Sequence, residues 1–158
     1  MIARPSLRSV RSSVDRADAA RAAAETLRSA DDEWFAACLA SSAYHLVKAA
    51  MLGDPIFDSP DELRLRDPRL TPESRFITTH QGLRGADGRS LGLTDVVRIL
   101  YPAIAVEYER LHMASRDIHY GDGLGVISAE SVIDDYSVIR DAWDSELLRA
   151  DETESGWS

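Results

Sequence analysis

The stretch Trp34–Leu52, WFAACLASSAYHLVKAAML, decides the fold. Apolar and small residues recur within it at spacings of three and four, the period of one face of an α-helix: Phe35, Leu39, Ser42, Leu46 and Ala50. Asp31 and Asp32 precede the stretch, where carboxylates cap free backbone N–H groups and complement the helix dipole. Gly53 and Pro55 follow it and end a helix. The sequence therefore predicts a long core helix that begins near Asp32.

Three further segments also have a helical composition or period. Residues 13–27 are rich in Ala, Arg and Glu, which favour helix. Thr94 is the expected N-cap of a helical run that continues to residue 120, and Pro102 should kink that run or divide it in two. Ser128 opens a last helix with an apolar stripe of Val132, Tyr136, Ile139, Trp143 and Leu147.

The connection between residues 54 and 92 differs from these segments in kind. Four prolines and four glycines interrupt it, and it has little hydrophobic period. Short helical turns are expected only at residues 61–66 and 73–81. No strand pattern of any length appears in the sequence. We therefore expect an all-α fold, a four- to five-helix up-and-down bundle with a long irregular connection between its second and third helices.

Length and composition limit the organisation and the partners. The 158 residues suffice for one domain, which we place at 13–149, between a flexible basic arm at 1–12 and an acidic frayed tail at 150–158. The net charge of −9 argues against nucleic-acid binding by the whole surface, so RNA would need a local basic cleft or the arm. A single cysteine, Cys38, and no apolar run near 20 residues favour a cytoplasmic protein that binds no membrane.

The end of the third helix carries the residues best suited to chemistry. Helical spacing places His112, Arg116 and His119 along one face. Two imidazoles and a guanidinium could supply a general base, a general acid and a charge stabiliser for phosphoryl chemistry, with Arg110 and His112 binding phosphate. The alternative is a polar stripe that complements the helix dipole. His45 is expected to flank the core.

No metal or other cofactor is predicted. His112 and His119 lie two helical turns apart, and the chain has neither an HExxH motif nor a second cysteine. Any chemistry at these residues would therefore depend on the side chains alone.

Two segments carry a resemblance to a known family. Trp34–Leu52 has small residues and an aromatic-plus-His step before an aliphatic run, and Tyr108–Tyr120 has a Tyr-x-x-Leu step before Ser-Arg and a final aromatic residue. Arg66–Leu70 is similar to the connection in one subgroup. Over about residues 30–147 the chain thus resembles the HEPN-like superfamily of all-α, toxin- and defence-associated proteins. The resemblance implies a helical bundle that forms a homodimer.

The resemblance also implies a choice between two functions. Many HEPN-like proteins are metal-independent ribonucleases with an Arg-x4–6-His motif in a cleft that two subunits share, and others have lost the motif and serve as binding or assembly modules. Arg116 and His119 are closer together than this motif requires. Arg75 and His80 match Arg-x4-His, but about one such match is expected by chance, and it falls in the irregular connection. These four residues are the candidate catalytic residues.

We expect a non-catalytic, dimeric interaction or assembly subunit of a toxin–antitoxin or defence-type system, with a cognate protein partner. The alternative is a metal-independent HEPN ribonuclease that acts on RNA with an Arg/His pair at a dimer cleft. A third reading, small-ligand or nucleotide binding in the connection, stays open.

Overall fold

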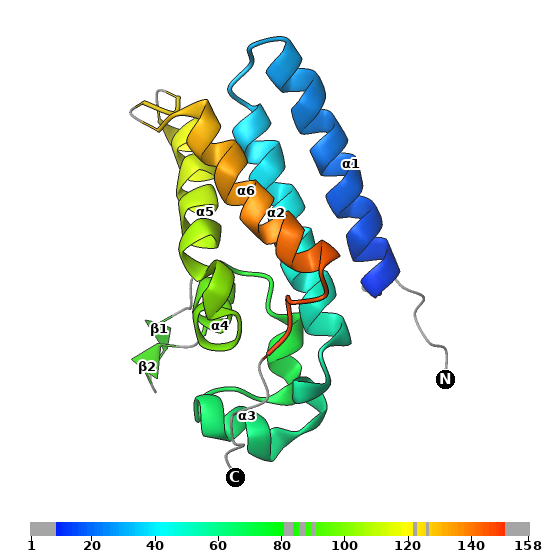
Figure 1. The fold of residues 1–158 in the computed structure, drawn as a ribbon. Coiled ribbons are helices and arrows are strands. Elements are labelled where there is room, and N and C mark those ends of the chain that lie inside the picture. The colour runs from blue at the N-terminus through cyan, green and yellow to red at the C-terminus, as the bar shows by residue number, and fades with distance from the viewer. Residues whose placement is uncertain are drawn as a thin grey trace, which may run out of the picture.

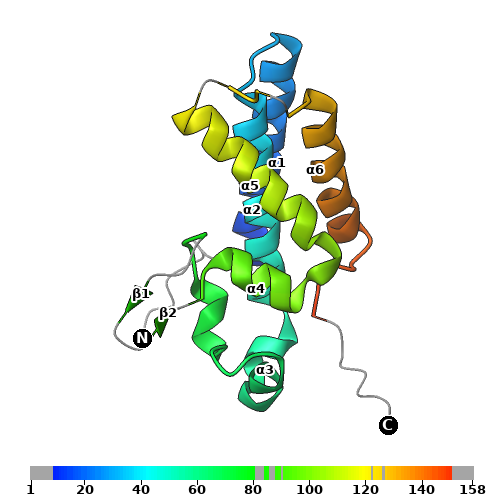
Figure 2. The ribbon, with the colours of Figure 1, turned by 90° about the vertical axis from the view of Figure 1, so that its left-hand side faces the viewer.

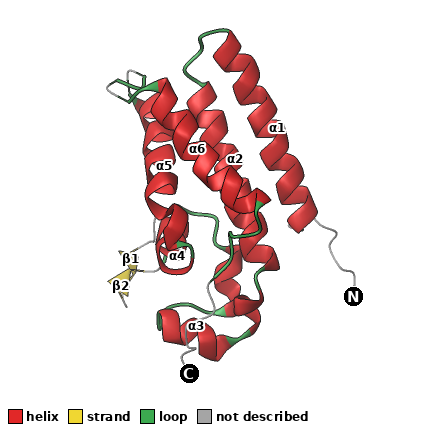
Figure 3. Ribbon diagram, in the orientation of Figure 1, coloured by secondary structure: helices red, strands yellow, loops and turns green. Residues whose placement is uncertain are grey.

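The computed structural model describes most of the chain: residues 9–80, 84–85, 88–89, 91–121, 123–125 and 127–150. Within these ranges the protein is all-α, and six α-helices pack against each other (Figure 3). The fold class predicted from the sequence is confirmed.

Four long helices form an up-and-down bundle (Figure 1). They are α1 (Val10–Ser29), α2 (Phe35–Gly53), α5 (Ala105–Tyr120) and α6 (Ala129–Asp144). The central helix, α2, packs against the other three, and Figure 2 shows α5 crossing it. The apolar stripe of α2 explains this position, because a helix that is buried on most sides must be apolar on most sides.

The described part of the connection after α2 contains one short α-helix and two short helical turns. The turn Pro55–Asp58 leads into α3 (Pro60–Arg66), and a second turn covers Pro72–Phe76. The expected turn at 61–66 is therefore present as α3, whereas the one expected at 73–81 ends at Phe76. Two-residue strands, β1 (Arg84–Gly85) and β2 (Gly88–Arg89), pair antiparallel before α4 (Leu93–Leu100). Pro102 divides the predicted third helix into α4 and α5, with the turn Pro102–Ile104 between them.

The helix starts differ from two of the predictions. The long run begins at Leu93 with Gly92 as its N-cap, because the Asp95 carboxylate reaches back and accepts a hydrogen bond from the Gly92 N–H at 2.9 Å. Thr94 is therefore not the cap. Helix α2 begins at Phe35, later than expected, because the Asp32 carboxylate accepts from the Trp34 N–H and forms a turn before the helix.

Two other termini bear on the predicted domain limits. Ser128 caps α6 by accepting from the Ser131 N–H, as expected. Helix α1 already begins at Val10, because Ser9 and Ser12 form a reciprocal capping box, so the last residues of the predicted arm 1–12 are helical. Residues 1–8 and 151–158, which hold the rest of the arm and most of the acidic tail, lie outside the described residues.

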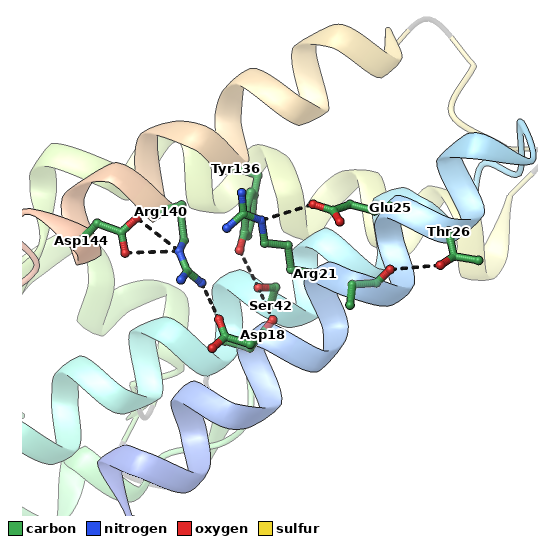
Figure 4. A network of polar contacts seen from close by, with 10 residues as sticks. Asp18, Arg21, Glu25, Thr26, Ser42, Tyr136, Arg140 and Asp144 are labelled. Carbon is green, nitrogen blue, oxygen red and sulfur yellow. Dashed lines mark hydrogen bonds and ion pairs between the residues drawn. The ribbon is translucent and has the colours of Figure 1, made fainter.

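A polar network joins α1, α2 and α6 (Figure 4). The Ser42 hydroxyl donates to the Ala17 carbonyl and lies 2.7 Å from the Tyr136 hydroxyl. Next to it, Arg140 of α6 forms an ion pair with Asp18 of α1 at 2.8 Å. Each of these groups has a partner within the protein. We call this side of α2, which faces α1 and α6, the closed side.

Helix α2 is long and apolar enough to cross a membrane by length and composition, with a mean hydropathy of 1.3. The expectation that no segment reaches this range is therefore wrong for α2. In the folded chain, 56% of this window is buried inside the bundle, and the core helix of a folded protein meets the same criterion. The finding is thus weak evidence for a membrane span.

Candidate functional site

All four histidines of the chain line one cavity of about 290 Å³ between α2, α5 and the segment that precedes β1. Helix α2 contributes His45, and α5 contributes His112 and His119. The connection contributes His80. Tyr44 and Tyr108 also line the cavity. Residues from three separate parts of the sequence therefore meet at one place.

Local structure explains how these side chains reach the cavity. His112 and His119 are seven residues apart, so two helical turns bring them to the same face of α5, about 10 Å from each other along the axis. The backbone at His80 is held against the start of α4. There, the Leu93 N–H donates to the Thr79 carbonyl at 2.7 Å and the Thr94 N–H to the His80 carbonyl at 3.1 Å.

His80 and His112 form the centre of the site. Their rings are stacked, with centroids 4.0 Å apart and an angle of 23° between the planes. The Tyr108 hydroxyl lies 3.5 Å from Nδ1 of His80, at the limit of a hydrogen bond, and helps to orient that ring. Helix α5 thus holds one imidazole and the connection holds the other, with the two ring faces against each other.

Burial and neighbouring charges keep these imidazoles neutral. Burial, together with the charge of His112, lowers the pKa of His80 to about 4. Burial also lowers the pKa of His112, and Arg116 adds to that effect. At pH 7 both rings are therefore uncharged and can accept a proton.

The other two histidines lie on either side of this pair. His45 contacts Tyr44 edge to face, and burial with a contribution from Arg16 lowers its pKa. His119 contacts Trp34 edge to face, with ring centroids 4.8 Å apart. The four imidazoles thus extend along the cavity from the start of α2 to its middle.

A second cavity, of about 260 Å³, continues from the first and shares Tyr44, His45 and Thr78 with it. Its wall adds Arg16 of α1 and Lys48 of α2. Lys48 is 8% exposed and donates to the carbonyls of Arg75 and Ile77. We call the two cavities together the histidine groove. None of the described residues that line it is an Asp or a Glu, although the chain carries a net charge of −9.

The predicted arginines have different surroundings. Arg116 is exposed on α5, one helical turn after His112, and burial together with the charge of Arg116 lowers the pKa of His112. Arg110 pairs with Asp135 of α6 at 2.6 Å, and this carboxylate raises its pKa. The predicted phosphate-binding role of Arg110 therefore competes with a contact that holds α5 to α6.

Arg75 does not join His80 at the groove. Its guanidinium donates to the carbonyls of Met51, Leu52 and Asp54 and pairs with Asp58 at 3.1 Å. These bonds satisfy carbonyl groups at the C-terminus of α2, which otherwise lack helical partners. The Arg-x4-His spacing at 75–80 thus joins a helix-capping arginine to a groove histidine, and the expected pair is not formed.

Sequence reasoning assigned His45 to the edge of the core and did not select Tyr44 or Tyr108. The structure places all three in the wall of the groove. Their side chains fall on helix faces that also carry core residues, so the helical period alone does not distinguish them. In the part of the chain that the structure describes, no group of three or more His, Cys, Asp or Glu side chains is arranged to hold a metal ion.

No model of a known protein family matches the chain, and neither a curated protein nor a solved structure is detectably similar to it. The resemblance to HEPN-like proteins therefore rests on the residues quoted above, and the functional argument depends on the geometry of the groove.

Proposed function

We propose that the histidine groove binds the phosphates of RNA and cleaves the strand without a metal ion, as in a HEPN-like ribonuclease. The observation that carries the proposal is the convergence of every histidine of the chain on a groove whose described wall has no carboxylate. On a protein of net charge −9, a groove without carboxylates repels a phosphate less than an acidic surface does.

The stacked pair supplies the acid and the base. Neutral His80 takes the proton from a ribose 2′-hydroxyl, and the oxygen attacks the adjacent phosphorus. The bond from phosphorus to the 5′-oxygen breaks, and His112, in the protonated form that it takes at pH values below its lowered pKa, gives its proton to that leaving oxygen. The products are a 2′,3′-cyclic phosphate and a free 5′-hydroxyl. The ring centroids lie 4.0 Å apart, so both imidazoles are near enough to act on the entering and leaving oxygens of one phosphorus.

Positive charge near the pair stabilises the transition state. Arg116 lies close enough to His112 to affect its pKa, and it can pair with the non-bridging phosphate oxygens. Of the two arginines predicted to act with histidines, Arg116 is thus the one that the geometry supports.

The test is cleavage of a fluorescent single-stranded RNA in the presence of EDTA. We expect the parent protein to cleave it, and His80→Gln and His112→Gln to lose about 100-fold or more of the rate, as when a general acid or base is removed. Arg64→Ala, on the exposed surface of α3, is the matched control and should cleave like the parent. If both histidine variants keep the parent's rate, the groove is not a nuclease site.

A second candidate function is supported by a separate surface. Val106 and Met113 are seven residues apart on α5 and are 56% and 58% exposed. This spacing gives an apolar stripe of the kind that pairs helices. We infer from it a homodimer. A homodimer also fits the second function, a non-catalytic assembly subunit of a toxin–antitoxin or defence-type system with a cognate protein partner.

Light scattering tests this candidate. The parent should be a dimer at micromolar concentration, and Met113→Asp should be a monomer with an unchanged helical spectrum. If the parent is a monomer, or if Met113→Asp stays dimeric, the α5 stripe is not a dimer contact.

A further inference from the structure

An aromatic cluster lies where the groove meets the start of α2. Trp34 contacts His119 edge to face at 4.8 Å, and the ring of Tyr120 lies 6.0 Å from that of His119. Trp34 is 46% exposed and Tyr120 is 88% exposed, although both are large apolar rings. We call Trp34, His119 and Tyr120 the aromatic platform. His119 belongs both to the platform and to the groove, so the two are continuous.

The charges beside the platform restrict what it can bind. On the side away from the groove, Trp34 shares a shallow cavity with Asp31, Asp32 and Glu33. Three carboxylates repel a phosphate at this position. An uncharged planar group is not repelled, and it gains from contact with an exposed indole ring.

We propose that the aromatic platform is a stacking subsite for one unpaired nucleobase of a single-stranded nucleic acid whose phosphates lie in the histidine groove. The inference rests on the proposed function, since the groove must hold the strand. The carboxylates then act as a boundary: the phosphates stay on the side of His119, and the neutral base turns onto Trp34.

This subsite would determine the class of substrate. Bases in a duplex are already stacked on each other and present only their edges, whereas an unpaired base offers its face to an aromatic side chain. Stacking makes little distinction between bases, because each has a π-face. The platform therefore selects single strands and adds little sequence specificity.

The test compares two deoxyribonucleotide oligomers of equal length and charge, one of adenylates and one with abasic sites. DNA lacks the 2′-hydroxyl, so binding is measured by anisotropy without cleavage. We expect the parent to bind the adenylate oligomer at least 10-fold more tightly than the abasic one. Trp34→Ala should remove this difference and Trp34→Phe should keep most of it. Leu65→Ala, which truncates a residue that is 77% exposed on α3, should bind like the parent.

The outcomes separate the two proposals. Equal binding of both oligomers by the parent overturns the platform and leaves the groove in place, whereas binding of neither overturns both. If Trp34→Ala keeps the full preference for bases, the subsite is not at Trp34. If it keeps that preference and dissociates a dimer, Trp34 belongs to a protein contact. Circular dichroism and the melting temperature of each variant show whether it is folded, and Trp34→Phe serves as the readout if Trp34→Ala is not.

Discussion

The polar groups on two sides of α2 have different surroundings. Towards α1 and α6, Ser42 is fully buried and bonds to both Ala17 and Tyr136 (Figure 4). Towards α5, His45 borders a groove in which burial lowers the pKa of three histidines. The first side satisfies its polar groups within the protein, and the second leaves imidazole edges at a cavity. This difference is the reason that we propose the α5 side as the ligand site.

The largest loss of stability is expected from a change in the apolar core of α2, which supports both sides. Leu39 is 6% exposed, in the apolar stripe of α2, so Leu39→Ala should lower the free energy of unfolding by about 2–5 kcal/mol. Urea denaturation measures this change. Leu65→Ala, at an exposed site, is the control and should stay within about 0.5 kcal/mol of the parent. A Leu39→Ala variant as stable as the parent would contradict the central position of α2.

A smaller effect is expected on the closed side alone. Ser42→Ala leaves the Tyr136 hydroxyl and the Ala17 carbonyl without their shared partner, which should cost about 1–3 kcal/mol of unfolding free energy. Its neighbour Ser41 is exposed at the groove. Ser41→Ala therefore changes the helix propensity by the same amount but removes no buried hydrogen bond. The comparison fails if both variants have the same stability, since Ser42 would then contribute no more than an exposed serine.

The buried histidines of the groove should make the stability of the protein depend on pH. The pKa of His80 is about 4 in the folded protein and about 6.5 in an unfolded chain. The unfolded chain therefore binds more protons as the pH falls below 6.5, and stability falls with it until about pH 4. His80→Gln should flatten this part of the curve, as measured by thermal melts between pH 4 and 7. An equally steep curve in His80→Gln would mean that His80 is not buried as a neutral ring.

The helices could be predicted from the sequence because their signals are local. The period of Phe35, Leu39 and Leu46 marks α2, and Pro102 divides α4 from α5 as its ring geometry requires. Caps were harder to predict, because neighbouring residues compete for the same N–H groups. Asp95 reaches back to Gly92 and displaces Thr94 from the predicted role.

The site could be predicted only where one helix holds it. Helical spacing alone places His112 and His119 on one face of α5. His80 and His45 join them through the packing of distant segments, which no spacing reveals. Arg75 illustrates the converse error, since closeness in sequence suggested a pair with His80, whereas the chain turns and the guanidinium closes the end of α2.

The most direct test of the central claim is the pH–rate profile for cleavage of single-stranded RNA in EDTA. In the proposed mechanism His80 is neutral and His112 is protonated, and the pKa of both is lowered. We therefore predict a bell-shaped profile with its maximum between about pH 4 and 6.5, which His80→Gln abolishes. The absence of cleavage at every pH, or a profile that His80→Gln leaves unchanged, would contradict the assignment of the histidine groove as the functional site.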